Sequence, residues 1–195
     1  CNKGMDILIR PGVADDVPAI TDLAVTTYIA AFGHSFTPED LAAHLAHNLA
    51  PTNVARFVAE DVVLVAEVAA EAAMRLVGFV QFGTAGPEYT PTDRCDQDLR
   101  RLYVLGEYQN QGAGTLLMEA ALAHPQMQAA PAVYLDVWEH NHGAQRFYAR
   151  HGFEVIGTRR FEVESDAETS LDLIMVRRAP LTPGPSSRPS PAPGL

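Results

Sequence analysis

The chain has 195 residues, of which 47% are apolar and 19% charged, and its formal net charge is −10. A chain of this length and composition can bury one sizeable core without disulfide or metal staples. The acidic balance argues against a nucleic-acid surface, which normally needs a basic patch. Charges also interrupt every apolar run before it reaches the ~20 residues of a membrane span. We therefore expect neither nucleic acid nor a membrane as a partner.

Cysteine usage and the N-terminal segment indicate a reducing compartment. The two cysteines, Cys1 and Cys95, offer neither a disulfide framework nor the spacing of metal ligands. The N-terminus also lacks a charged-then-apolar secretory signal. We therefore expect a cytoplasmic protein, and we interpret residues 1–4, which precede Met5, as a cloning remnant or an upstream extension.

The first elements along the chain are a strand and two helices. Residues 7–10 predict a strand, and Asp15 or Asp16 is expected to cap a helix that has Pro18 in its first turn. Apolar residues recur at helical spacing after it. Thr37 is expected to cap a second helix, because proline and then periodic leucines follow it.

A hairpin and a loop come next. Residues 62–68 and 75–82 predict its two strands, and glycine, proline and polar residues mark a loop over residues 83–96. His44 and His47 share one face of the preceding helix, but no third ligand lies near them in sequence. We therefore predict no metal site.

The most informative stretch leads from a strand through two glycines into a helix. Residues 99–105 form an apolar-rich run of strand length, and apolar residues recur at helical spacing from Ala113 onward. Gly112 and Gly114 therefore lie at a helix N-terminus, which offers unpaired N–H groups and the positive end of a dipole. Because neither glycine has a Cβ that would hold a phosphate away from those amides, the loop predicts a pyrophosphate cradle.

Two common phosphate loops do not fit this pattern. A P-loop needs Gly-x-x-x-x-Gly-Lys-Ser/Thr, and no lysine follows these glycines. A dinucleotide fold needs three glycines spaced Gly-x-Gly-x-x-Gly. The loop therefore indicates a different class of pyrophosphate ligand.

The last part of the chain predicts strand, helix and two further strands. Residues 132–138 predict a strand, and Asn141 and Gly152 mark the start and the stop of a short helix after it. Strands over residues 153–163 and 170–176 complete a domain that we place at residues 5–179. The six prolines of residues 180–195 leave a tail that cannot pack a core and is expected to be disordered.

The spacing of these motifs resembles a known family. Gln109-x-x-Gly112-x-Gly114 is similar to the acyl-CoA signature Gln/Arg-x-x-Gly-x-Gly/Ala of the GCN5-related N-acetyltransferases. A second motif of that family is matched at every position by Asn141, Ala144, Phe147, Tyr148, Gly152 and Phe153. Other segments are similar to its bacterial spermidine/spermine acetyltransferase branch, namely residues 26–32, 35–41, 135–139 and 171–175.

This resemblance implies an α/β (α+β) fold with a central mixed, mostly antiparallel sheet of about six or seven strands, flanked by about four helices and splayed where acyl-CoA inserts. It implies acetyl-CoA as cosubstrate. Its pantetheine arm is expected to contact the backbone of the strand over residues 99–105, and its pyrophosphate is expected to lie in the loop with Gly112 and Gly114. The expected cofactor-binding residues are Leu102, Tyr103, Val104, Gln109, Asn110, Gln111, Gly112, Ala113, Gly114, Thr115, Asn141, Ala144, Phe147 and Tyr148. The alternative is that the glycines only allow tight packing of helix on strand.

Two residues are the candidate catalysts. Tyr148 is expected as general acid, because a phenol can protonate a departing thiolate; the alternative is a core aromatic beside Phe147. Asn141 would bind the cofactor or a water, cap its helix, or do both.

The family often carries a glutamate three residues before the segment that starts at Arg101, where this chain has the shorter Asp98. Asp98 is then a base that acts through a water relay, or only a solvated charge at a strand edge.

We therefore expect an enzyme that moves acetyl from acetyl-CoA to a primary amine by direct attack, with a small-molecule amine as its partner. A polyamine such as spermidine or spermine is the first choice, since an acidic protein attracts cations, and Glu107 and Glu139 are the candidate substrate carboxylates. Peptide N-termini or lysine side chains are alternative acceptors, and a CoA-binding regulatory module without catalysis is the alternative class. Whether the chain forms a homodimer stays open.

Overall fold

The computed structural model describes residues 6–70, 73–89, 93–161 and 170–179. Three expectations fall outside this part of the chain. They are the extension at residues 1–4, the tail at residues 180–195, and the last two residues of the strand predicted over residues 153–163.

Seven strands form one sheet in the order β1-β2-β3-β4-β5-β7-β6. Neighbours run antiparallel except β4 and β5, which pair in parallel. The bounds are β1 (Ile7–Pro11), β2 (Val62–Ala69), β3 (Met74–Thr84), β4 (Gln97–Val104), β5 (Ala132–Trp138), β6 (Glu154–Phe161) and β7 (Ser170–Arg178). The mixed, mostly antiparallel sheet that the resemblance implies is confirmed.

Six α-helices flank the sheet within the described ranges, together with three short 3₁₀ turns. The helices are α1 (Val17–Phe32), α2 (Pro38–Asn48), α3 (Pro51–Glu60), α4 (Ala113–Ala123), α5 (Pro125–Ala129) and α6 (His142–Arg150); the turns are η1 (Ala14–Asp16), η2 (Gly33–Ser35) and η3 (Gly106–Tyr108). Sequence reasoning misses α3 and α5. α5 is only one turn long, whereas α3 has Pro51 at its start and Val54, Phe57 and Val58 at helical spacing, a signal that sequence reasoning could have used.

The helix ends follow the predicted capping residues with one exception. The Thr37 and Asn141 side chains accept backbone N–H bonds at the starts of α2 and α6, and Gly152 follows α6 with φ of 85°. Asp16 occupies the N-cap position of α1, but its side chain does not cap that helix. Its carboxylate instead binds the Arg10 guanidinium at 2.7 Å, a charge-assisted contact that is stronger than a neutral cap.

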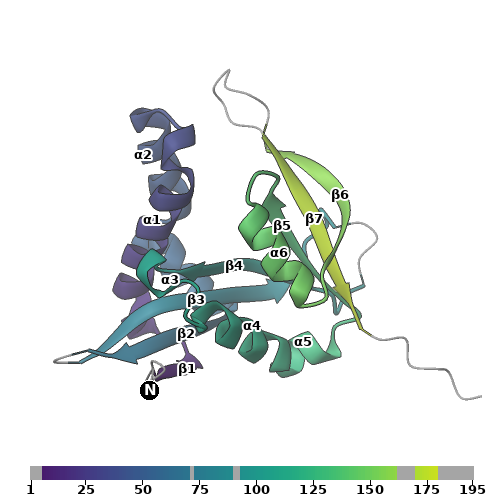
Figure 1. Cartoon of the computed structure of the whole chain (residues 1–195), viewed down its shortest axis with the longest axis horizontal. Coiled ribbons are helices and arrows are strands. Elements are labelled where there is room, and N and C mark those ends of the chain that lie inside the picture. Colours follow the sequence, from purple (N-terminus) through teal and green to yellow (C-terminus); the bar gives the residue numbers. More distant parts are fainter. Residues whose placement is uncertain (1–5, 71–72, 90–92, 162–169, 180–195) are drawn as a thin grey trace, which may run out of the picture.

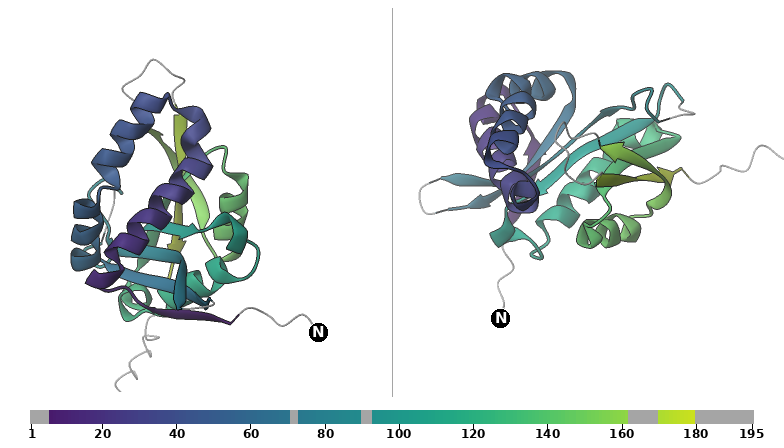
Figure 2. Two further views of the ribbon diagram at one scale, coloured as in Figure 1. Left: turned by 90° about the vertical axis from the view of Figure 1, so that its left-hand side faces the viewer. Right: turned by 90° about the horizontal axis from the view of Figure 1, so that it is seen from above.

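Two apolar clusters cover the two faces of the sheet. In β2, Val63 and Val65 pack in the cluster that includes α1 and α3, whereas Leu64 and Ala66 pack in the cluster that includes α4. This is the alternation expected of a strand that is covered on both faces. The result is a molecule with α1, α2 and α3 at one end and α6 with β5, β6 and β7 at the other (Figures 1 and 2).

The two ends meet where β4 and β5 pair, and that pairing is short. Only Gln97 with Val133 and Asp98 with Tyr134 are in register. Both strands run on, β4 to Val104 and β5 to Trp138, and Figure 1 shows them turning away from each other. Backbone groups on the inner edges beyond Asp98 therefore face a wedge instead of a partner strand, and the predicted splay is confirmed.

Candidate active site

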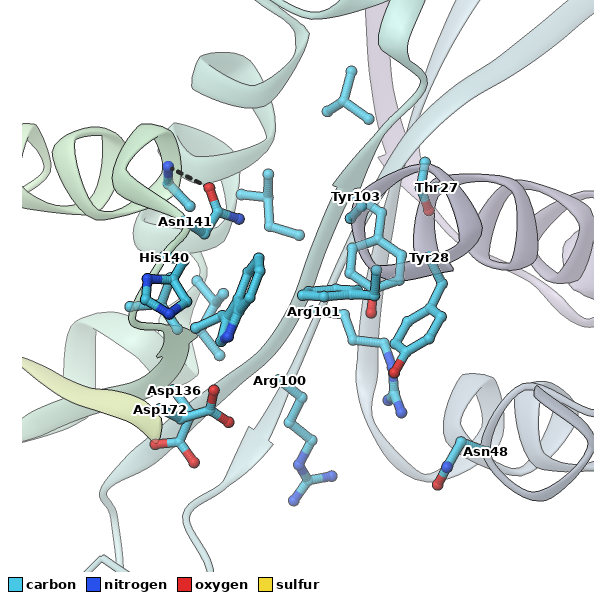
Figure 3. A pocket seen from close by; sticks show the side chains of 18 of the residues that line it. Thr27, Tyr28, Asn48, Arg100, Arg101, Tyr103, Asp136, His140, Asn141 and Asp172 are labelled. Atoms are coloured by element: carbon cyan, nitrogen blue, oxygen red, sulfur yellow. Dashed lines mark hydrogen bonds between the residues drawn. The ribbon is translucent and has the colours of Figure 1, made fainter. Parts of the chain in front are cut away.

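The wedge between β4 and β5 contains a cavity of about 1010 Å³. Its walls come from α1, α2, β4, β5, β7 and α6 together with the segments between them, so it joins regions that are far apart in the sequence. Figure 3 shows the two walls facing each other, with Tyr28, Arg101 and Tyr103 on one side and Asp136, His140, Asn141 and Asp172 on the other.

The loop between β4 and α4 has the backbone shape of an anion cradle. Asn110 and Gly112 adopt left-handed angles, with φ of 58° and 96°, and α4 starts without a side-chain cap. The bond from Leu116 N to Gly112 O closes its first turn. The N–H groups that an α-helix leaves for a ligand are therefore those of Ala113, Gly114 and Thr115.

Backbone geometry requires a glycine at position 112, whereas packing does not require one at position 114. Gly112 needs its positive φ, and an added Cβ there would meet nothing within 4 Å, so the space beside the amides is open for a phosphate. A Cβ on Gly114 would lie 3.8 Å from the side chains of Leu102 and Phe147, an ordinary contact. Tight helix–strand packing therefore does not require these glycines, and the cradle interpretation is favoured.

The end of β4 presents its backbone to the cavity. Leu102, Tyr103 and Val104 line the wall, as does Gln109. The Gln109 side-chain amide donates to the Val104 carbonyl at 3.1 Å. A β4 carbonyl is thus within reach of a side-chain amide, and the amide of an extended ligand could take the same bond by strand addition.

The start of α6 forms the opposite wall. Asn141 Oδ1 accepts from Ala144 N at 3.1 Å while Asn141 lines the cavity (Figure 3), so the residue caps its helix at the edge of the site. Ala144 and Tyr148 also line the cavity. Phe147 is not part of this wall and packs instead beside Tyr148, with ring centroids 5.5 Å apart.

Tyr148 is both a packed ring and a cavity residue. Its ring lies 5.9 Å from that of Phe153 as well as beside Phe147. Burial, with a smaller effect of the nearby Tyr103 phenol, raises the pKa of Tyr148 well above its usual range. Its hydroxyl therefore stays protonated at neutral pH, as a proton donor must.

Asp98 lies behind the cavity and is not on its wall. It is 7% exposed, and the Tyr89 hydroxyl donates to its Oδ1 at 3.2 Å. Burial is the largest influence and raises the pKa of Asp98 to about 6, against an opposing effect of Arg100. The solvated strand-edge alternative is wrong. Asp98 is also absent from the cavity wall, because the strands part only beyond it, whereas Arg100 lines that wall.

The two expected substrate carboxylates are placed differently. Glu139 lines the cavity, and its Oε1 accepts from Leu171 N at 3.1 Å. Glu107 does not line it: this side chain is 58% exposed on η3 and pairs with Arg75 at 2.8 Å. Glu107 lies close to the end of β4 in sequence, which suggests a substrate role. In the structure, η3 directs its side chain toward Arg75 on β3, so the structure does not support that role.

Sequence reasoning misses two carboxylates of the site. Asp136 on β5 and Asp172 on β7 line the cavity and lie side by side in Figure 3. Burial raises the pKa of both. Strand alternation could have found Asp136, because it shares a face with Tyr134 and Trp138. Asp172 becomes visible only when the topology pairs it with Trp138.

The cavity also has an aromatic wall, which we define as Tyr28, Phe32, Phe36 and Trp138, all of which line it. The Phe32 ring lies 4.9 Å from that of Tyr28 and 5.7 Å from that of Trp138. His44 stacks on Tyr28 at 4.6 Å, and burial lowers the pKa of His44, so its imidazole is neutral. This wall connects α1 and the segment between η2 and α2 to β5 across the wedge.

Neither a metal centre nor a membrane-spanning helix is found in the described ranges. Across those ranges, no group of three or more His, Cys, Asp or Glu side chains could hold a metal ion. No helix in the same part of the chain is long and apolar enough to cross a membrane.

Comparisons with known proteins agree with this geometry. The family model of the acetyltransferase (GNAT) domain matches residues 59–155. A protein of Mycobacterium tuberculosis described as an uncharacterised N-acetyltransferase is 32% identical over 164 residues, 84% of this chain and 96% of that protein. A spermine/spermidine N(1)-acetyltransferase of Bacillus subtilis is 32% identical over 91 residues, 46% of this chain and 59% of that protein.

Solved structures share the fold. The PaiA N-acetyltransferase of Thermoplasma acidophilum in complex with coenzyme A superposes with a TM-score of 0.69 at 19% identity, over 90% of this chain and 100% of that one. An acetyltransferase of the GNAT family from Streptococcus pneumoniae gives a TM-score of 0.63 at 18% identity, over 89% of this chain and 100% of that one.

Proposed function

The chain belongs to the GNAT family of N-acetyltransferases and moves the acetyl group of acetyl-CoA to an amine, and we propose that this amine is a polyamine of the spermidine type. One observation carries the proposal. The cavity combines three carboxylates, Asp136, Glu139 and Asp172, with the aromatic wall. Carboxylates and aromatic faces are the two kinds of group that bind alkylammonium cations.

The two arginines of the cavity do not cancel this preference. The Arg100 guanidinium already pairs with the Asp61 carboxylate. Arg101 lies over the Phe57 ring, 5.3 Å from its centroid, and donates to the Gln81 amide oxygen. Arg100 is thus already paired with a carboxylate, and Arg101 is engaged on the wall opposite Asp136 and Asp172 (Figure 3).

Two further observations support a cationic acceptor. The net charge of −10 raises the local concentration of cations around the molecule. The Bacillus subtilis relative is named for spermine and spermidine, although the match covers only 46% of this chain. We also place the enzyme in the cytoplasm, where acetyl-CoA and small amines are available together.

The proposed reaction is direct attack without an acyl-enzyme. Cys95 is exposed and does not line the cavity, so it is not placed to form an acyl-enzyme there. Tyr148 protonates the departing thiolate, the α4 N-terminus holds the pyrophosphate, and the free edge of β4 holds the pantetheine arm. The ammonium must lose a proton first, because an alkyl amine with a pKa near ~10 is charged at neutral pH.

Thiol release from acetyl-CoA over a panel of amines tests this proposal. We expect kcat/KM for spermidine and spermine to exceed that for butylamine by about tenfold for each ion pair worth ~1.4 kcal/mol. Glu139→Gln and Asp172→Asn should raise KM for spermidine but not for butylamine. Glu154→Gln, which removes an exposed carboxylate paired with Arg178, is the matched control and should change neither value.

Two outcomes contradict the polyamine proposal. Equal kcat/KM for spermidine and butylamine would show that the second ammonium group is not recognised. Acetylation confined to peptide N-termini or lysine side chains would assign a different acceptor class to the same chemistry.

A further inference from the structure

Asp136 lies where the two strands part. Pairing of β4 with β5 ends at Asp98 and Tyr134, and Asp136 is the next β5 residue on the face of Tyr134. Trp138 follows on that face, ~7 Å farther along the strand. Continued in the same register, Trp138 is level with Leu102, whose backbone lies at the cofactor edge. Asp136 therefore lies on the β5 side of the wedge and shares the cavity with Leu102 on the β4 side.

The two oxygens of this carboxylate differ. Oδ2 of Asp136 lies 2.8 Å from Arg159 Nη1. Oδ1 is buried and, like Nη2 of the same Arg159, lies beyond hydrogen-bond distance of a partner among the residues that the structure describes. A buried acceptor without a partner costs free energy, and such an atom in a folded protein calls for an explanation. The Asp136 side chain nevertheless lines the cavity beside Asp172 (Figure 3), so its carboxylate lies next to an amine held there.

We propose that Asp136 is the general base of the amine acetylation, an inference that rests on the proposed function. Its carboxylate takes one proton from the incoming ammonium group, and the freed lone pair forms the C–N bond at the acetyl carbonyl carbon. The C–S bond then breaks, and Tyr148 gives its proton to the sulfur. Tyr148 regains a proton through water from the nitrogen, which becomes a neutral amide. Asp136 returns its proton to solvent, so each turnover releases one proton.

Asp98 positions a side chain that packs beside Asp136. It accepts a hydrogen bond from the Tyr89 hydroxyl at 3.2 Å. The Tyr89 ring stacks on Tyr134 at 4.8 Å and lies 4.9 Å from the Arg159 guanidinium. Asp98 therefore fixes the residue that covers the Asp136–Arg159 pair, and it is a positioning residue, since it does not reach the cavity.

Several charged groups set the proton affinity of Asp136. Burial is the largest influence and raises its pKa, and Arg159 opposes that effect. Asp172 raises this pKa further, and the Tyr89 hydroxyl lowers it. The charged and titratable groups that act on Asp136 are Glu88 and Tyr89 from the loop after β3, Asp98 from β4, Arg159 from β6 and Asp172 from β7.

The test is the pH profile of Asp136→Asn with spermidine as acceptor. General-base catalysis is typically worth ~10²–10⁴-fold, so kcat/KM at pH ~7 should fall by that factor while the calorimetric Kd for acetyl-CoA stays unchanged. The loss should shrink about tenfold per pH unit as the amine approaches its own pKa near ~10. Asp136→Glu should recover part of the rate. A purely structural role gives a loss that does not depend on pH.

A second variant keeps the inference testable if Asp136→Asn does not fold. Arg159→Gln removes the cation that lowers the Asp136 pKa, so the acidic limb of the kcat/KM profile should move to higher pH. Arg160→Gln, an exposed neighbour on the same strand, is the matched control and should leave that limb in place.

Three results separate the possible failures. Wild-type kcat/KM in a folded Asp136→Asn, or an unmoved acidic limb in Arg159→Gln, would overturn the base assignment and leave the acetyltransferase intact. A pH-independent loss in Asp136→Asn would overturn it as well. A wild-type enzyme that acetylates no amine would instead refute the proposed function.

Discussion

At Tyr148 the ring serves packing and the hydroxyl serves chemistry, so removing one oxygen atom separates the two roles. Its ring contributes contacts with Phe147 and Phe153, and its hydroxyl keeps its proton because burial raises the pKa. Removing the hydroxyl should therefore affect the chemical step and leave the packing of α6 in place.

For Tyr148→Phe we expect kcat to fall by ~10²-fold or more, as for loss of a general acid, with little change in melting temperature. Steady-state kinetics and thermal unfolding on the same preparation check this. If kcat stays at the wild-type value, or falls only in step with stability, Tyr148 is a packing residue.

Asp98 is a single residue that makes the free energy of unfolding depend on pH. Its folded pKa is about 6 against an ordinary value of 3.8, so the folded chain binds more protons than the unfolded chain between these values. Stability from the neutral carboxyl is present at low pH and is lost as the pH rises through ~6, by up to about 3 kcal/mol.

Asp98→Asn should therefore flatten the curve of unfolding free energy against pH between ~4 and ~7. Urea denaturation at a series of pH values measures it. Asp22→Asn, at an exposed position of α1, serves as the control. A wild-type slope in Asp98→Asn would mean that this carboxyl ionises freely in the folded chain.

Single residues are predictable from sequence where a short motif fixes them. Asn141 and Tyr148 belong to one helix with a recognisable cap and stop, and both reach the cavity as expected. The predicted substrate role of Glu107 is not supported, because no local sequence signal indicates its ion pair with the distant Arg75. Asp136 and Asp172 are missed because each is an ordinary strand charge until the topology places them side by side.

At the scale of elements, the β4–loop–α4 unit carries the cofactor prediction. Gly112 has φ of 96° and open space where a Cβ would lie. Any side chain there is strained, and an acidic one would also repel the pyrophosphate from the α4 amides.

Gly112→Ala should weaken acetyl-CoA binding, and Gly112→Glu should abolish it, while both retain normal circular dichroism. Calorimetry with acetyl-CoA measures the affinity. Gly106→Ala is the matched control, since an added Cβ there also meets nothing within 4 Å and no positive φ is needed. Unchanged affinity in Gly112→Glu would place the pyrophosphate elsewhere.

Most elements could be predicted because their signals are local. Thr37 marks the start of α2, and Asn141 and Gly152 bracket α6. Of the two missed helices, α5 spans only five residues, whereas α3 has no capping side chain but does carry apolar residues at helical spacing that could have identified it. The splay is also invisible to local reasoning, because it depends on β4 and β5 sharing only two residue pairs; it enters only through the family resemblance.

At the scale of the whole molecule, the acceptor half of the site is assembled by topology. The aromatic wall comes from α1, the segment between η2 and α2, and β5, and the carboxylates come from β5, the residue after it and β7, with more than 100 residues between Tyr28 and Asp136. No single window of the sequence contains this combination. It exists because β5 is inserted between β4 and β7.

The net charge of −10 gives a prediction at this scale. Attraction between exposed charges is screened over roughly 10 Å at ~0.1 M salt, so kcat/KM for spermidine should fall as salt rises from ~0.05 to ~0.3 M. Butylamine, with one charge that is lost before attack, should show a much smaller change. Parallel salt dependences for the two amines would show that the field of the protein does not select the acceptor.

The measurement that tests the account most directly is a competition. The wild-type protein is incubated with acetyl-CoA and equal concentrations of spermidine, butylamine, a peptide with a free N-terminus and a lysine-containing peptide with a blocked one. The products are then quantified by mass spectrometry. We predict that acetylspermidine dominates and that the free thiol formed matches it in amount. Acetylation mainly of butylamine or of either peptide, or thiol release without any acetylated amine, would contradict the account.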